Sequence, residues 1–112
     1  MTLCVDTDVH SPLHDPVDVT RVLSRAGRIV NIGKVIKEYD AIDTGIFLCT
    51  PVIFEALEAS FAAGDDSISG AMKVLAGWGK ARTFDVTGRL WVDVDDPAAF
   101  AHAERLIEEG RL

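Results

Sequence analysis

An apolar run that leads directly into a helix start is the feature that most constrains the fold. Residues 41–50 contain the unbroken triplet Ile46-Phe47-Leu48, which is typical of a buried strand. Thr50-Pro51 follows at once. It predicts a helix with Pro51 at its first position and the Thr50 hydroxyl as its cap. A buried strand joined to a helix favours an α/β or α+β layer architecture.

The other segments are short and are separated by Gly and Pro signals. The pattern predicts a strand at 3–5, a loop at 10–16, a hairpin of 20–24 with 28–32, two helices before Gly64 and Gly77, strands at 84–87 and 90–95, and a helix after Asp96-Pro97. Ser67 or Asp66 should start the second helix. In the last helix we expect Phe100, Ala103, Leu106 and Ile107 to face inward. The fold class is therefore α/β, a mixed sheet with a β-hairpin and about three helices.

Composition excludes several classes of function. The chain has 112 residues, enough for one domain, and a net charge of -7, with its Lys and Arg scattered. Nucleic-acid binding is not expected, because phosphate contacts need clustered cations. Cys4 and Cys49 lie far apart in apolar runs, where cysteine acts as a small hydrophobe. No apolar run approaches the roughly 20 residues of a membrane span. We expect a cytoplasmic protein.

Two longer stretches carry a resemblance to a known family. One is Glu38-Tyr39-Asp40-Ala41-Ile42-Asp43-Thr44-Gly45-Ile46-Phe47 with Thr50-Pro51, and the other is Trp91-Val92-Asp93-Val94-Asp95-Asp96-Pro97. Together with residues 27–34 and 64–69, in this order, they resemble the C-terminal half of the nucleotidyltransferases. The branch they match is that of inositol-1-phosphate cytidylyltransferases and sugar-phosphate nucleotidyltransferases. The resemblance covers the chain from about Leu3 to Leu106 and implies the C-terminal part of a Rossmann-like nucleotidyltransferase fold.

The chain also departs from the family pattern. A Gly-rich loop with an Arg, a Pro-Lys element and a strand ending in a metal-binding Asp mark the N-terminal half of such enzymes, and none of them occurs here. The resemblance therefore implies that residues 1–112 form a single partial domain, the acceptor-binding half, without the nucleotide-binding half. We therefore expect an enzyme that is catalytically incomplete on its own.

Alternation along residues 90–95 separates two faces of the expected strand. Leu90, Val92 and Val94 would face the core, and Trp91, Asp93 and Asp95 the other side. Carboxylates two apart on a strand lie on the order of 7 Å from each other. One would therefore ligate Mg²⁺ and the other would orient water or substrate.

The resemblance places the metal and the catalytic role on Asp93, with Asp95 as the second metal carboxylate, and Mg²⁺ is expected only in a complete site. The alternative is that both aspartates are solvated strand residues.

The resemblance also implies an acceptor site. Asp43-Thr44-Gly45 matches the strand that touches a sugar or inositol, Lys34 matches a phosphate contact, and Trp91 shares the face of Asp93. Glycine would allow close approach of a ligand, and the Thr44 hydroxyl would donate to it. The alternatives are a packing glycine and an exposed hairpin lysine.

Two further groups of residues resemble functional motifs but lack the sequence context that those motifs require. Residues 77–82 look like a phosphate-binding loop but follow a helix and precede a strand, so a helix C-cap is the better interpretation. The group Asp6, Asp8, His10, His14 and Asp15 has no recognised metal-ligand spacing.

A second class of function stays open beside nucleotidyl transfer. Half of an open sheet should leave an apolar face and an unpaired strand edge, which proteins usually cover. The chain would then be a non-catalytic binding or assembly module. This hypothesis predicts a homodimer or a complex with a complementary N-terminal half. The resemblance implies a sugar or inositol phosphate as the small-molecule partner.

Overall fold

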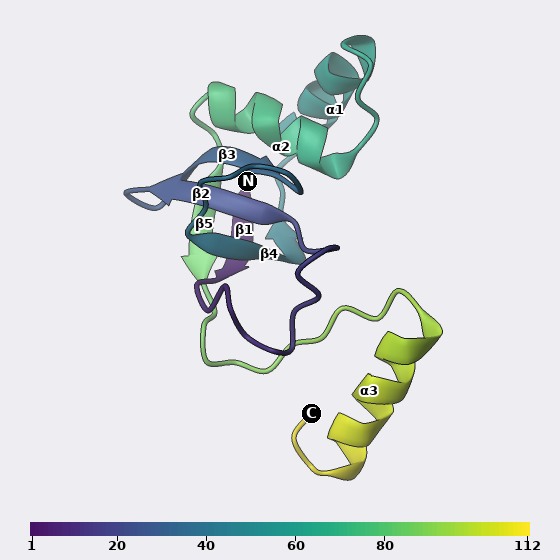
Figure 1. Cartoon of the computed structure of the whole chain (residues 1–112). Coiled ribbons are helices and arrows are strands. Elements are labelled where there is room, and N and C mark those ends of the chain that lie inside the picture. The colour runs from purple at the N-terminus through teal and green to yellow at the C-terminus, as the bar shows by residue number, and fades with distance from the viewer.

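A computed structural model describes all 112 residues and contains five strands and three helices. The elements in chain order are β1 (Thr2–Asp6), β2 (Arg21–Arg25), β3 (Arg28–Gly33), β4 (Ala41–Leu48), α1 (Val52–Ala62), α2 (Ile68–Gly77), β5 (Arg82–Asp85) and α3 (Pro97–Glu108). The α1–α2 pair covers one end of the strands, and α3 lies apart beyond the other end (Figure 1). The mixed sheet, the β2–β3 hairpin and the three helices confirm the predicted fold class.

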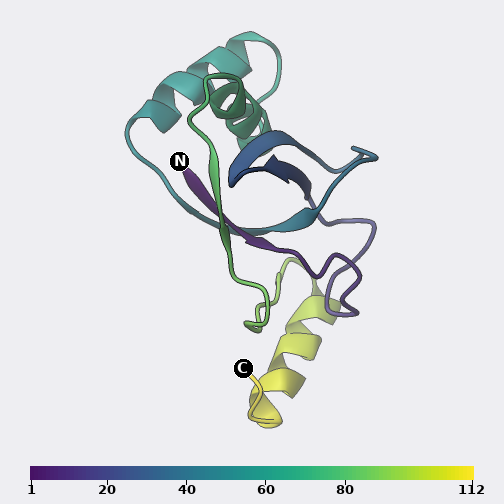
Figure 2. The same ribbon diagram turned by 90° about the vertical axis from the view of Figure 1, so that its left-hand side faces the viewer.

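The sheet closes on itself. The strand order is β1-β4-β2-β3-β5, with β1 and β5 parallel and the other neighbours antiparallel. Closure depends on the pair Arg28 and Arg82, flanked by backbone bonds from Ile29 to Ala81 and from Thr83 to Gly27. Figure 2 shows the strands wrapped around a common centre. The expected unpaired edge is therefore wrong, because the first and last strands of the order pair with each other.

The apolar interior continues from the barrel into the helix pair. Leu3, Val22 and Ile32 from the strands pack in one cluster with Met72 and Leu75 of α2, and all five are almost completely buried. The Ser67 side chain accepts the Gly70 N–H and caps α2, as predicted. At α1 the prediction is wrong, since Pro51 occupies the N-cap and the Thr50 side chain caps nothing. The Thr50 carbonyl accepts the Ile53 N–H instead.

The C-terminal region differs most from expectation. Residues 90–95 form no strand and connect β5 to α3 as an open segment (Figure 1). The Asp96 side chain caps α3 as predicted, and Ala103 and Leu106 are buried. Phe100 and Ile107 are instead exposed, because α3 makes few contacts with the other elements. None of the three helices combines the length and apolarity needed to cross a bilayer.

Candidate functional site

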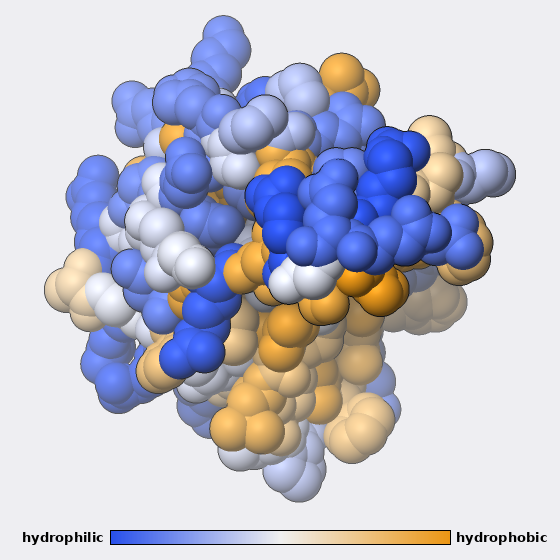
Figure 3. Space-filling view, turned by 90° about the horizontal axis from the view of Figure 1, so that it is seen from below, coloured by the Kyte–Doolittle hydropathy of each residue, from blue (hydrophilic) through white to orange (hydrophobic).

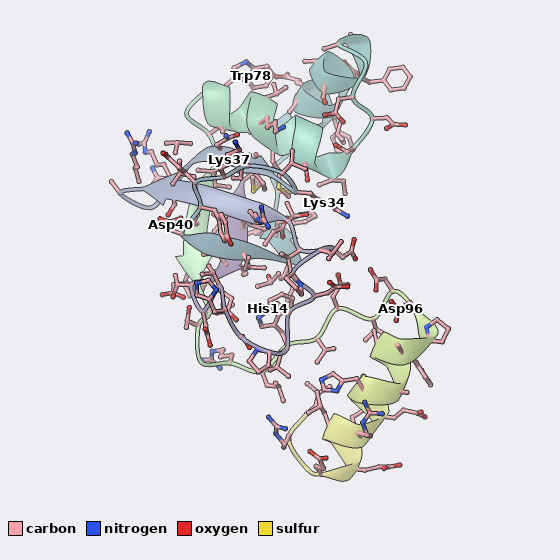
Figure 4. The ribbon with its side chains drawn as sticks, in the orientation of Figure 1. His14, Lys34, Lys37, Asp40, Trp78 and Asp96 are labelled. Atoms are coloured by element: carbon pink, nitrogen blue, oxygen red, sulfur yellow. The ribbon has the colours of Figure 1, made fainter.

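A cleft of about 560 Å³ lies between the lower side of the barrel and the start of α3. It is lined by all seven residues that the sequence assigned to metal or acceptor: Lys34, Asp43, Thr44, Gly45, Trp91, Asp93 and Asp95. In Figure 4, Lys34 projects from the barrel on the side that faces Asp96 at the start of α3. The fold thus brings segments more than forty positions apart in the chain to one cavity.

Three exposed carboxylates gather at one side of this cleft. Oxygen atoms of Asp18, Asp93 and Asp95 lie within 4.8 Å of one another. The neighbouring Asp18 carboxylate raises the pKa of Asp95, because it can accept a hydrogen bond from the protonated Asp95 carboxyl, and desolvation and the charge of Asp93 raise this pKa further. The spacing of roughly 7 Å expected for a regular strand is wrong, because the segment is not a strand and the side chains of Asp93 and Asp95 converge.

Lys34 belongs to the same charged group. Its Nζ donates to Asp18 Oδ1 at 2.8 Å, and both side chains are about half exposed. This bond lowers the pKa of Asp18 and raises the pKa of Lys34, and attraction between the two charges adds to both shifts. The lysine therefore supplies a cation beside the acid cluster.

Asp43 lies on the barrel side of the cleft. Its Oδ1 accepts the Gly45 N–H at 2.6 Å. Burial raises the pKa of Asp43, and the nearby charge of Asp93 adds to the effect, while the bond from Gly45 opposes it. A partly buried carboxylate with a raised pKa costs folding free energy when it is ionised.

Because ionised Asp43 costs folding free energy, Asp43→Asn should raise the stability of the fold in a pH-dependent way. Because the folded state raises the pKa of Asp43 above its ordinary value of 3.8, the penalty is full above the folded pKa and disappears below 3.8. Asn keeps an oxygen for the Gly45 N–H and loses the charge. We expect a Tm rise of roughly 1–3 °C at pH 7 and no rise at pH 3, measured by calorimetry. Glu58→Gln, on an exposed face of α1, is the control. An equal rise at both pH values would contradict the assignment.

Thr44 and Gly45 form an irregularity in β4 rather than a free binding surface. Register between β1 and β4 shifts around Cys4, and Gly45 adopts φ +77°. The Thr44 hydroxyl donates to the Cys4 carbonyl at 2.8 Å. Donation from Thr44 to an acceptor stays a prediction, and it would require the hydroxyl to leave the Cys4 carbonyl. Gly45 is required for its backbone angle, because L-residues rarely adopt it.

Trp91 is anchored by two buried side chains. Its Nε1–H donates to Asp6 Oδ2 at 2.9 Å, and its ring lies 4.9 Å from that of His14, between centroids. The side chains of Asp6 and His14 are more than nine-tenths buried. The indole therefore presents a fixed apolar wall to the cleft. A metal role for the 6–15 group finds no support, since Asp6 and His14 are committed to Trp91.

Asp18, Asp6, His14 and His102 are the cleft or anchor residues that sequence reasoning missed. For Asp18 a signal was available: Arg21 pairs with Gly33 in the hairpin, so residues just outside the two strands meet at one end. For Asp6 and His14 the sequence contains no such signal. Their roles depend on contacts with Trp91, whose position in the fold the sequence does not show. His102 lines the cleft from α3.

In fold, this barrel with its helix pair and acidic cleft is that of a nucleotidyltransferase. It superimposes on the solved structure of the inositol-1-phosphate CTP transferase from T. maritima with a TM-score of 0.80 and 31% sequence identity. The match covers 96% of this chain and 44% of that one.

More particularly, the sequence is similar to proteins named bifunctional IPC transferase and DIPP synthase. It is 34% identical over 96 residues to the one from Rubrobacter xylanophilus and 35% identical over 92 residues to the one from Thermococcus kodakarensis. These matches cover 83% and 80% of the chain. The chain spans about a fifth of the length of these relatives, 22% and 20%. No family model matches it. The resemblance to the C-terminal half of an inositol-phosphate nucleotidyltransferase is thereby confirmed.

Proposed function

We propose that this chain is the acceptor-binding part of an enzyme that transfers a cytidylyl group from CTP to an inositol phosphate. What carries the proposal is the convergence of Lys34, Asp43, Trp91, Asp93 and Asp95, from distant segments, on one cleft. The names of the relatives supply the acceptor and the nucleotide. The 112 residues then form one partial domain, and a nucleotide-binding half completes the site. Because the donor is a nucleoside triphosphate, we assign the reaction to the cytoplasm.

In this reaction a phosphate oxygen of the acceptor attacks the α-phosphorus of CTP. A new P–O bond forms, the bond to the bridging oxygen of the β-phosphate breaks, and pyrophosphate leaves. Lys34 would attract the acceptor phosphate by exchanging its bond with Asp18 for one with a phosphate oxygen. Asp43 would accept from inositol hydroxyls, and the Trp91 ring would hold the apolar face of the inositol against the wall of the cleft.

Asp18, Asp93 and Asp95 would hold Mg²⁺ at this site. The donor set fits, because Mg²⁺ prefers oxygen ligands and needs one or two carboxylates beside phosphate and water. When bound, the ion would neutralise charge that develops on the transferred phosphoryl group. Asp93 has the catalytic role in this proposal.

Acceptor binding by the chain alone tests the proposal. Inositol 1-phosphate with Mg²⁺ is expected to raise the Tm, because a ligand that binds the folded state stabilises it. Lys34→Ala should weaken this binding about tenfold, roughly 1.4 kcal/mol. Lys37→Ala is the matched control, since Lys37 is exposed on the same connection and outside the cleft (Figure 4). No stabilisation by any inositol or sugar phosphate, in the presence of Mg²⁺, would refute the acceptor site.

A second candidate function is an assembly module without catalysis. Phe54 and Phe61 on α1 are 66% and 71% exposed, an apolar row that a partner would cover. We propose a homodimer through this row, which light scattering would detect as a doubled mass. A monomer that binds inositol phosphate would contradict the assembly module and support the acceptor-binding function.

A further inference from the structure

A second cavity, of about 380 Å³, lies between the β1–β2 connection and the strands β2 and β4. Seven of its lining residues belong to positions 9–19 of this connection, and the others are Arg21, Tyr39 and Ile42; we call it the Arg21 cavity. Arg21 and Ile42 are direct partners in the β2–β4 pair. Three of the lining residues, His14 among them, also line the cleft, so the two cavities are neighbours. Figure 4 shows His14 on the connection below the barrel.

The lining of the Arg21 cavity differs in charge from the rest of the chain. The chain has 18 acidic residues and a net charge of -7, and hydrophilic side chains cover much of the face seen from below (Figure 3). None of the ten residues that line the Arg21 cavity is acidic, and its polar side chains are those of His10, Ser11, His14, Arg21 and Tyr39. Asp15 and Asp40 are neighbours of lining residues in the sequence, but they accept hydrogen bonds from other backbone N–H groups. A cavity with charge of one sign attracts ligands of the opposite sign, so the expected ligand is an anion.

The guanidinium group of Arg21 has no counter-charge within the chain. None of the three ion pairs of the structure includes it, and its Nε is buried and donates to no group. Its Nη1 donates to the Ile36 carbonyl at 3.2 Å, and its Cζ lies 4.8 Å from the centroid of the Tyr39 ring. These two contacts hold the cation at the cavity wall. Water can accept a hydrogen bond from such a donor, but it does not balance the charge, and a charge withdrawn from water without a partner costs free energy. An anion in the cavity would supply the missing counter-charge.

The donors around the cavity favour an oxyanion of the phosphate class. A guanidinium presents its N–H groups as a planar fork that matches two oxygens of a phosphate. The Ser11 hydroxyl oxygen accepts the Leu13 N–H at 3.3 Å, which leaves its own hydrogen free for a ligand. Donors from the connection and from β2 thus face one cavity, as an ion with oxygens in several directions requires. A volume of about 380 Å³ also leaves room for a small organic group on the phosphate, against the apolar side chains of Val19 and Ile42.

We propose that the Arg21 cavity binds a small phosphate-class oxyanion through the Arg21 guanidinium, at a site separate from the cleft that holds Lys34. Lys34 and the carboxylates of the cleft do not line the Arg21 cavity. His14 lies between the bound ion and Trp91, because its ring packs on the Trp91 ring at 4.9 Å between centroids. The inference goes beyond the proposed function and does not depend on it, since neither the metal nor the acceptor takes part.

A titration with inorganic phosphate tests the site. The 112-residue chain is held at constant ionic strength without Mg²⁺, and the Nε–H resonance of Arg21 is followed by NMR. Because Nε is buried, its proton is shielded from exchange with solvent. The resonance should shift saturably, with a Kd of about 1 mM or tighter. This measurement is made on the unaltered chain, so it does not depend on the folding of a variant.

Three substitutions locate the bound ion, with the shifts of backbone amides in residues 9–19 as the measurement. Arg21→Met keeps a long side chain without the charge and should weaken phosphate binding at least about tenfold. Arg21→Lys keeps the charge but loses the planar fork, so it should also weaken binding, and it serves in place of Arg21→Met if that variant does not fold. Arg25→Met is the matched control, because Arg25 is an exposed arginine of the same strand outside both cavities, and it should leave the Kd unchanged.

Lys34→Ala separates the Arg21 cavity from the cleft. If phosphate binding survives Lys34→Ala and is weakened by Arg21→Met, the inference is supported, whatever the result with inositol 1-phosphate. If binding is lost in Lys34→Ala and kept in Arg21→Met, the phosphate occupies the cleft and the inference is wrong. A shift that does not saturate, or that chloride produces equally at the same ionic strength, also overturns it, because screening of charge would then explain the response.

Discussion

Asp93→Asn is expected to reduce pyrophosphate release by roughly 10²–10³-fold in the assembled enzyme. The carboxylate lies in the acid cluster with Asp18 and Asp95, where it would hold the cation that stabilises the transferred phosphoryl group. Removing one group that stabilises developing charge typically costs about 3–4 kcal/mol. The measurement is the initial rate with CTP, inositol 1-phosphate and Mg²⁺, made on the chain joined to a nucleotide-binding half, for which the unmatched part of the T. maritima enzyme can serve.

Asp93→Asn should increase the stability of the fold, although it decreases activity. Asp93 adds to the raised pKa values of Asp43 and Asp95, so its charge is repelled by its neighbours when no cation is bound. Asp93→Asn should therefore raise the Tm without Mg²⁺ and reduce the further rise on adding it. Glu104→Gln, on an exposed part of α3 outside the cleft, controls for net charge. An unchanged rate in Asp93→Asn would remove the residue from the mechanism.

Gly70→Ala is expected to destabilise the fold by about 1–3 kcal/mol, although alanine normally favours a helix interior. A Cβ at Gly70 would meet the Ser60 Oγ and would lie 2.5 Å from Asp65 Cγ. Neither neighbour moves freely, because Ser60 donates to the Asp65 carbonyl and Asp65 accepts from Ser67. The Tm should fall by roughly 5–15 °C in a calorimetric scan.

Gly77→Ala supplies the comparison within the same helix. A Cβ at Gly77 meets nothing within 4 Å, and its φ is not positive. The substitution should therefore leave stability unchanged or raise it by up to about 1 kcal/mol. Equal effects of the two substitutions would contradict the prediction. They would show that contacts with Ser60 and Asp65 do not exclude a Cβ at Gly70.

Local signals were enough for most of the elements. Gly27 with the flanking β-branched runs gave the hairpin, and Ser67 and Asp96 gave the starts of two helices. These depend on a few adjacent residues. Closure of the barrel could not be predicted in this way, because the contact of Arg28 with Arg82 joins positions far apart and shows no pattern in the sequence.

The residues 90–95 show where a correct local pattern gave a wrong element. Alternation of Val and Asp predicts a strand, but a strand also needs a neighbour with free backbone groups. In the candidate site, the resemblance selected seven residues that line one cleft, while the engaged hydroxyl of Thr44 depends on the Cys4 carbonyl. Only the folded chain shows which polar groups are already bonded.

The way the C-terminal arm, residues 90–112, is fastened to the barrel has a mechanical consequence. The Trp91 indole donates a hydrogen bond to Asp6, and the carboxylates of Asp93 and Asp95 lie beside that of Asp18. When these three carboxylates are ionised they repel one another, and the Trp91–Asp6 bond is the side-chain hydrogen bond that still joins the arm to the barrel. A divalent ion held by these carboxylates would remove the repulsion, so cation binding would also help to fix the position of the arm.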